Sequence, residues 1–152
     1  MDNIKVKLVK AHEDQMIDYE LKRELKSIQD YIDKIEFEML DKNVYFLFVK
    51  GLYDSFKKKM NTIAVFINNT GNEIVELHGV LRFTTKIEEN IKFAKTTIDF
   101  DEPFMGTLRN REAILIHLNI PVKGLECDRE FNVSGILNEF SDVKVKYAKG
   151  DK

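Results

Sequence analysis

The fold of this chain is decided by the stretch Val44–Phe83, which reads VYFLFVKGLYDSFKKKMNTIAVFINNTGNEIVELHGVLRF. Its first residues, Val44–Val49, are all apolar, which is typical of a core strand covered on both faces. A second strand-like run, Asn61–Asn68, ends in the polar turn Asn68–Asn72. Asn and Gly in such a turn tolerate the positive φ angles that tight connections require. The stretch therefore predicts consecutive antiparallel strands.

Alternation of apolar and polar residues extends this pattern toward the C-terminus. Ile74–Phe83 and Glu112–Ile120 alternate with period two, which predicts strands with one buried face. The apolar side of the second run holds Ile114, Ile116, Leu118 and Ile120. We expect further strands at Ile91–Phe100, Phe131–Leu137 and Asp142–Ala148. Short strands joined by short polar connections predict a mainly β protein, an immunoglobulin-like antiparallel β-sandwich.

The segment before these strands predicts one long N-terminal amphipathic α-helix. Residues 11–42 contain neither Gly nor Pro, and we expect a helix from about Glu13 to Leu40. At ~1.5 Å per residue it would be roughly 42 Å long. Its apolar residues are spaced 4, 3, 4, 3 and 4 apart, which is a heptad seam. The seam residues, our candidate partner-binding residues, are Leu21, Leu25, Ile28, Ile32, Ile35 and Met39.

Two interpretations of this seam stay open. The helix can pack its apolar stripe on its own sandwich, or the seam can contact a partner helix in another chain. Tyr19, Tyr31 and Phe37 lie off the seam positions and widen the apolar face. A wide stripe favours packing on a globular body over a two-stranded coiled coil.

Length and composition suggest one domain with an appendage. The chain has 152 residues, of which 43% are hydrophobic. We expect a strand (Ile4–Leu8) and the helix within residues 1–42, the sandwich within 43–148, and a charged tail at 149–152. The N-terminus lacks the apolar segment of a signal peptide, and no apolar run approaches the ~20 residues of a membrane helix. We expect a cytoplasmic protein without membrane insertion, whose association with the cell envelope would require a partner.

The residue types that carry catalysis do not form a recognisable pattern. The three histidines, His12, His78 and His117, are far apart in sequence and lack metal-ligand spacing. Cys127, the single cysteine, has acidic neighbours that disfavour a thiolate nucleophile. None of the seven glycines belongs to a phosphate-binding loop. We expect no enzyme activity, metal, cofactor or small-molecule substrate; a site assembled in space around His78 or His117 is the alternative.

The charge pattern argues against nucleic acid as a partner. The formal net charge is −2, which gives no overall attraction for phosphate backbones or anionic lipid. The basic residues Lys57–Lys59 form a short cluster without the interleaved aromatic residues of single-strand binding. Two Asn-x-Ser/Thr triplets, beginning at Asn68 and Asn132, match the glycosylation acceptor by chance in our interpretation.

Four pieces of the sequence together carry a family resemblance: Gly51–Tyr53, Ala64–Asn69, Phe93–Phe100 and Gly106–Leu108. They resemble the SLAP-type domain, a small module of Gram-positive bacteria named through S-layer assembly and accessory secretion. The chain is similar, more loosely, to FxLYD-type immunoglobulin-like modules through Asn68–Gly71 and Val143–Tyr147. The resemblance covers roughly Phe46 to Ile120 and leaves out the N-terminal helix. It implies an interaction module in cell-envelope or secretion-linked work.

Together these observations predict a non-enzymatic protein-binding or assembly module. Sandwich edges carry unpaired N–H and C=O groups that a partner strand can satisfy. The alternative is a homodimeric structural or regulatory protein whose N-terminal helices pair across a two-fold axis. In either case the expected partner is a protein, either another chain or a second copy.

Overall fold

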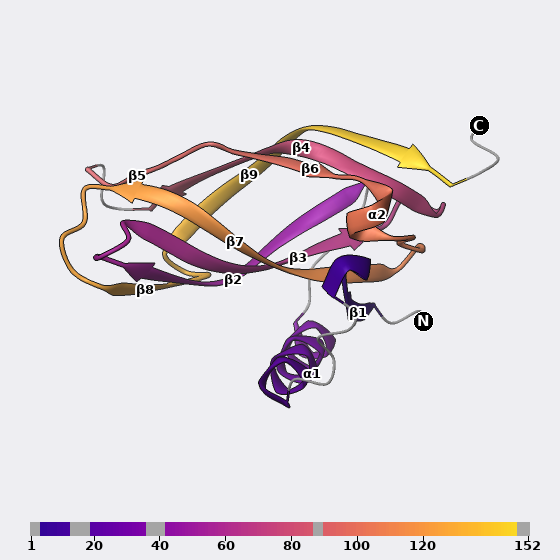
Figure 1. Cartoon of the computed structure of the whole chain (residues 1–152), viewed down its shortest axis with the longest axis horizontal. Helices are drawn as coiled ribbons and strands as arrows, with labels where there is room; N and C mark the ends of the chain where they lie inside the picture. Colours follow the sequence, from indigo (N-terminus) through magenta and orange to yellow (C-terminus); the bar gives the residue numbers. More distant parts are fainter. Residues whose placement is uncertain (1–3, 13–18, 36–41, 87–89, 149–152) are drawn as a thin grey trace.

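The computed structural model describes residues 4–12, 19–35, 42–86 and 90–148. Strands dominate and form two sheets that pack face to face, with helix α1 outside the larger one (Figure 1). This confirms the expected mainly β, sandwich-like architecture. The charged tail at 149–152 lies outside the described residues.

The larger sheet has six strands in the order β1-β7-β3-β2-β8, with β5 on the same edge of β7 as β1. The strands in this order are β1 (Lys5–Leu8), β7 (Glu112–Lys123), β3 (Lys59–Asn68), β2 (Val44–Asp54) and β8 (Arg129–Asn132). The sixth strand, β5, spans Lys92–Phe93. Strand β1 runs parallel to β7, and the other pairs are antiparallel. The described strand pairs within residues 43–148 are thus antiparallel, as expected for the sandwich, whereas β1, expected outside it, adds a parallel strand at this edge. The N-terminal strand is part of the main sheet.

The smaller sheet has three strands in the order β6-β4-β9. They are β6 (Thr96–Phe100), β4 (Ile74–Thr85) and β9 (Ile136–Tyr147). The register between β4 and β9 shifts between His78 and Val80, where Asp142 of β9 has a φ of 55°. This shift is a β-bulge, which reverses the inward and outward order of side chains along β9.

The main core lies between the two sheets and is rich in phenylalanine. Phe66 of β3 is fully buried and packs edge-on against Phe100 and Phe140 of the smaller sheet, with ring centroids 5.6 and 5.2 Å apart. Gly79 leaves room for the Phe140 ring, since a Cβ there would lie 2.4 Å from its nearest carbon. Ile114, Ile116, Leu118 and Ile120 face this core, as the alternation predicted.

The helix is shorter than the sequence predicts. Helix α1 spans Tyr19–Lys34, which is 16 residues or about 24 Å, and Ile35 is no longer helical. Residues 13–18 and 36–40 of the predicted helix lie outside the described residues. The prediction that the helix continues to Leu40 is wrong at Ile35. The sequence did not indicate this end because the segment contains no Gly or Pro. Apolar spacing alone does not locate a helix terminus.

Two predicted strands have different boundaries. Ile91–Phe100 is divided into β5 and β6, which belong to different sheets, because the buried positions change from odd to even between Phe93 and Ile98. Phe131–Leu137 contains the turn between β8 and β9, where Asn132 Oδ1 accepts hydrogen bonds from Ser134 N–H and Oγ. The last strand, β9, is continuous from Ile136. The bulge at Asp142 interrupts its apolar alternation, so the sequence pattern predicted a strand only from Asp142 onward.

A short helix, α2 (Glu102–Met105), was not predicted. Asp101 is its N-cap and accepts a hydrogen bond from the Phe104 N–H at 3.0 Å, and Pro103 lies in its first turn. An Asp followed closely by Pro is a recognised signal for a helix start.

Candidate functional site

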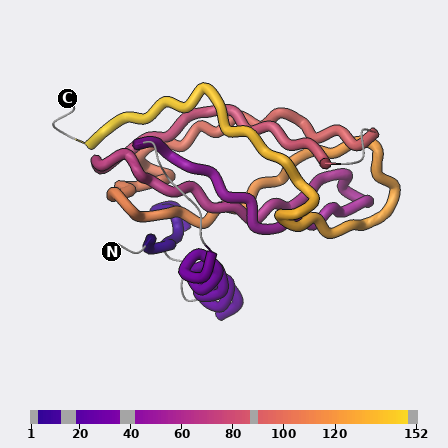
Figure 2. Tube along the Cα trace, turned by 180° about the vertical axis from the view of Figure 1, so that it is seen from behind, coloured from indigo at the N-terminus to yellow at the C-terminus, as the bar shows by residue number. Residues whose placement is uncertain are grey.

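The heptad seam of α1 packs on the chain's own larger sheet. Ile28 and Ile32 are 5% and 4% exposed and belong to a second buried cluster with Val65 of β3 and Leu115 of β7. Figure 2 shows the helix on the side of the larger sheet away from the smaller one. The remaining described seam residues, partly buried against this cluster, are Leu21, Leu25 and Ile35. Met39 lies outside the described residues.

A glutamine at the flank of the seam ties the helix to the sheet edge. Gln29 Oε1 accepts a hydrogen bond from the Val6 N–H, and its Nε2 donates to the Ile4 C=O, both at 2.8 Å. The backbone groups of Lys5 and Lys7 point toward β7. The Val6 N–H and the Ile4 C=O therefore point the other way, toward the open edge of β1. The Gln29 side chain thus takes the place of a neighbouring strand. Sequence reasoning missed this residue because it considered only the apolar positions.

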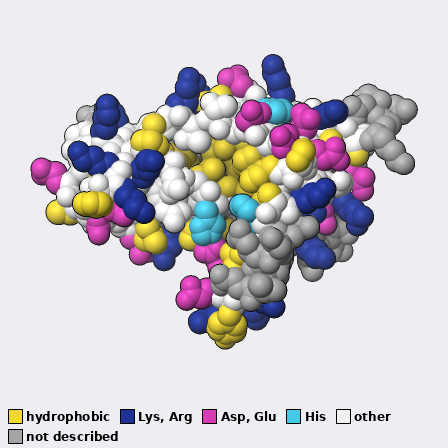
Figure 3. Space-filling view, in the orientation of Figure 1, with side chains coloured by type: hydrophobic (Ala, Val, Ile, Leu, Met, Phe, Trp, Pro, Cys, Tyr) yellow, Lys and Arg dark blue, Asp and Glu magenta, His cyan; other side chains and the backbone are white. Residues whose placement is uncertain are grey.

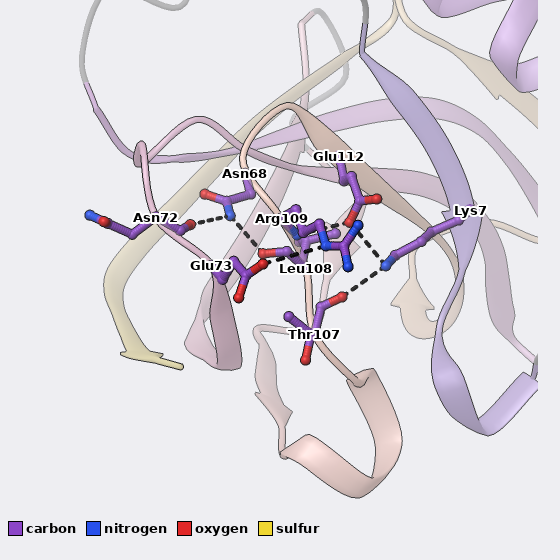
Figure 4. A network of polar contacts seen from close by, with 8 residues as sticks. All are labelled: Lys7, Asn68, Asn72, Glu73, Thr107, Leu108, Arg109 and Glu112. Atoms are coloured by element: carbon purple, nitrogen blue, oxygen red, sulfur yellow. Dashed lines mark hydrogen bonds and ion pairs between the residues drawn. The ribbon is translucent and has the colours of Figure 1, made fainter. Parts of the chain in front are cut away.

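A polar network closes one end of the sandwich (Figure 4). The Asn68 amide is fully buried and donates to the C=O groups of Asn72 and Leu108, both at 2.8 Å. Its oxygen accepts from the Thr70 N–H and hydroxyl. Its bonds to Thr70 and Asn72 fix the turn between β3 and β4, and its bond to Leu108 ties this turn to the segment before β7. A buried amide of this kind is not a glycosylation acceptor.

A carboxylate in the same network links β7 to β1. Glu112 lies 3.0 Å from the Lys7 ammonium and accepts from the Arg109 N–H at 2.8 Å. Burial works to raise the pKa of Glu112, but the hydrogen bonds from Arg109 and Lys7 outweigh it and lower the pKa. This arrangement is a structural closure of the sheet end, because its polar groups are satisfied by one another (Figure 4).

The histidines lie in three separate places. His117 of β7 contacts Glu24 of α1 at 2.6 Å, and His12 packs edge-on against Phe104. His78, on the outer face of the smaller sheet, lies between Glu76 and Asp99. The hydrogen bond with Glu76, followed by that with Asp99, raises the pKa of His78 above its ordinary value despite the opposing effect of burial.

Within the described residues, no group of three or more His, Cys, Asp or Glu side chains is placed to hold a metal ion. Cys127 is exposed. Neither helix in the described part of the chain has the length and apolar character needed to cross a bilayer.

An apolar area is exposed where the sandwich opens between β6 and β7. Figure 3 shows hydrophobic side chains gathered in the middle of this face, between the positions of the two strands in Figure 1. The elements around this opening carry hydrophobic residues that are only partly buried: Phe104 of α2 and Leu118 of β7. Exposed apolar areas of this kind often mark interaction surfaces.

The edge of β6 on this side has no strand partner in the described chain. The Lys86 N–H bonds to the Gly135 C=O, so even-numbered residues of β4 face β9 in this part of the ladder. Odd-numbered residues therefore face β6, where Leu81 pairs with Thr96. The alternation directs the N–H and C=O groups of Thr97 and Asp99 away from β4, toward the opening.

The facing edge of β7 is also unpaired over its middle. Pairing with β1 ends at Leu115, and pairing with β5 begins at Val122. The Pro121 C=O accepts from the Ala94 N–H at 2.9 Å, which shows that odd-numbered residues face this edge. In the described chain, the backbone groups of His117 and Asn119 consequently have no strand opposite them. Two free edges thus border the apolar opening.

Comparisons with known proteins found no match to this chain among family models, curated proteins or solved structures. The resemblance to SLAP-type and FxLYD-type modules therefore stays a prediction.

Proposed function

We propose that the chain is a non-enzymatic protein-binding module that accepts an extended partner segment at the opening between β6 and β7. The observation that carries this proposal is the exposed apolar area bordered by two unpaired strand edges. In strand addition, main-chain hydrogen bonds provide affinity, and apolar pockets select alternate side chains. A segment lying along β6 would satisfy the outward groups of Thr97 and Asp99 and cover the partly buried Leu118.

Strand β9 and the seam of α1 are less suited to this role. Strand β9 is long, but it carries a bulge at Asp142 and the exposed residues Lys144 and Lys146. Bulges and charged side chains, Lys above all, are the means by which natural sheets prevent edge pairing. The seam of α1 already packs on the chain's own sheet, so a partner using Ile28 or Ile32 would have to displace the helix. These contacts support β6 as the binding edge.

The setting that we propose follows the sequence resemblance. An immunoglobulin-like module of SLAP or FxLYD type would serve in assembly or secretion at a bacterial cell envelope. The antiparallel pairs and the two facing sheets are consistent with this proposal, and the parallel strand β1 and α1 are additions to it.

A proline at the edge of β6 tests the proposal. The Thr97 N–H faces the opening, so T97P removes one outward donor without removing a hydrogen bond to β4. Peptides enriched on the wild-type protein from a random display library should bind T97P at least ~10-fold more weakly. T97A is the matched control, because it keeps the N–H while losing the same side chain, and it should bind as the wild type does.

Hydrogen exchange of the backbone amides locates the contact. The enriched peptides should slow exchange at Thr97 and Asp99 and leave unchanged the outward-facing amides of β9, Val143 and Val145. The proposal fails if no peptide is enriched, if T97P binds as tightly as T97A, or if protection is confined to β9 or α1.

A further inference from the structure

A separate hollow lies at the corner where the chain crosses from the larger sheet to the smaller one. It has a volume of about 510 Å³ and lies between the end of β4 and the β5–β6 connection. Its lining consists of Arg82, Phe83, Thr84, Thr85, Ile91, Lys92, Phe93 and Lys95. Pockets of ~300–1,000 Å³ are typical of small-molecule sites. The hollow does not depend on strand addition at β6.

The rim of the hollow is positively charged. Arg82, Lys92 and Lys95 are exposed, and no carboxylate is among the described residues that line the hollow. Within the described chain none of these cations forms an ion pair, although Glu139 is the cross-strand neighbour of Arg82. The Arg82 guanidinium instead donates to the Ser141 hydroxyl at 3.0 Å, which restrains it. Cations clustered without acids attract a negatively charged group.

The floor of the hollow is apolar and held in place by aromatic packing. Phe83 and Ile91 are 3% and 4% exposed, so they form a buried base. The half-buried Phe93 ring packs against Phe83 and Phe131, with centroids 6.2 and 5.7 Å away. Such a ring offers a fixed surface to a flat ligand.

The backbone of β4 adds a hydrogen-bond donor to the hollow. Odd-numbered residues of β4 face away from β9, and the pairing with β6 ends at Leu81. The Phe83 N–H therefore points to the side where no strand continues in the described chain. An oxyanion at this point would meet an N–H group in addition to the ammonium groups of Lys92 and Lys95.

We infer that this hollow binds a small organic anion with a flat apolar body, of about the size of a mononucleotide. Its negative group, a phosphate, sulfonate or carboxylate, binds Lys92, Lys95 and the Arg82 side. Its flat body lies on Phe93. Hydrogen bonds to charged groups are about twice as strong as those between neutral groups, so the anionic end supplies most of the selectivity.

A fluorescence titration with 8-anilinonaphthalene-1-sulfonate tests the inference on the full chain. This probe carries one sulfonate on a flat apolar ring system. The variant K92Q/K95Q should raise the Kd of the probe at least ~10-fold, which corresponds to about 1.4 kcal/mol. The matched control is K144Q/K146Q on β9, which brings the formal net charge from −2 to the same −4 and should change the Kd less than ~2-fold. Circular dichroism and thermal unfolding confirm that both variants fold.

Competition separates the charged group from the apolar body. Adenosine 5′-monophosphate should displace the probe, and adenosine should displace it far more weakly. The inference is overturned if the wild type shows no saturable binding, if the two double variants weaken binding equally, or if adenosine competes as well as its phosphate. Since neither variant alters β6, failure here leaves the strand-addition proposal standing, and the reverse also holds.

Discussion

The outer faces of the two sheets of this sandwich differ in polarity and in what covers them. The outer face of the larger sheet is apolar where α1 covers it through Ile28 and Ile32. The outer face of the smaller sheet carries charged residues such as Glu76, His78 and Lys144, and no described element covers it. An antiparallel sheet with a solvated face needs alternation, whereas a sheet covered on both faces needs continuous apolar strands. The comparison explains why β2 and β3 are so apolar while β4 and β9 alternate.

The largest expected difference between the two faces is in stability. Truncating Ile32, which is 4% exposed under the helix, should lower the free energy of unfolding by ~2–5 kcal/mol in I32A. Truncating Leu137, which is 51% exposed on the smaller sheet, should change it by less than about 0.5 kcal/mol in L137A. Urea unfolding followed by circular dichroism measures both.

The same pair of variants addresses the two interpretations of the seam. Loss of stability without a change in oligomeric state favours a helix that serves its own sheet. If I32A keeps its stability and instead changes the mass measured by light scattering, the seam has an intermolecular role, and the homodimer alternative gains support.

The hydrogen bonds of Gln29 give the next largest effect. In Q29A the Val6 N–H and the Ile4 C=O lose their partner, and leaving such groups unsatisfied costs ~1–3 kcal/mol. Amide exchange at Val6 should become faster than in the wild type, while exchange at Lys7, whose N–H faces β7, should stay unchanged. D33A is the control, because it removes only the exposed Gln29–Asp33 contact at 3.0 Å and should be nearly neutral. Equal losses in Q29A and D33A would contradict this account of the β1 edge.

The fold class could be predicted because strand periodicity is local information. The alternation of Ile114, Ile116, Leu118 and Ile120 reports a buried face directly, and the structure confirms that face. Strand boundaries were predicted less well where two features overlap. The bulge at Asp142 interrupts the alternation without ending β9, and the division between β5 and β6 falls within one weakly alternating run.

The candidate sites depend on pairing, which a single sequence does not report. The cations Arg82, Lys92 and Lys95 come from two separate segments, and they meet only because β4 continues past the end of β6. The unpaired groups of Thr97 follow from sheet order in the same way. The parallel pairing of β1 with β7 is likewise a long-range contact. Gln29 is different: a polar residue next to Ile28 on a seam was a visible signal.

The smallest effect concerns the charged face itself. Because the hydrogen bond to Glu76 and then that to Asp99 raise the pKa of His78, the protonated histidine stabilises the folded chain. This contribution is fully present below the ordinary pKa of about 6.5 and is lost as the pH rises through the raised value. We therefore expect a shallow fall in stability as the pH rises above about 6.5 and through the raised pKa, flattened in H78Q.

The groups around His78 determine how the titration should respond to substitution. Glu76 on its own strand and Asp99 on β6 favour the charged imidazole, while Lys144, its Cα partner on β9, opposes it. Asp142, beside the bulge, adds a further negative charge to this surface. An NMR titration of the imidazole should give a pKa above the ordinary value, reduced in E76Q and D99N and raised in K144Q. A pKa at or below the ordinary value in the wild type would mean that solvent screens both carboxylates, and that the uncovered face contributes no pH dependence to folding.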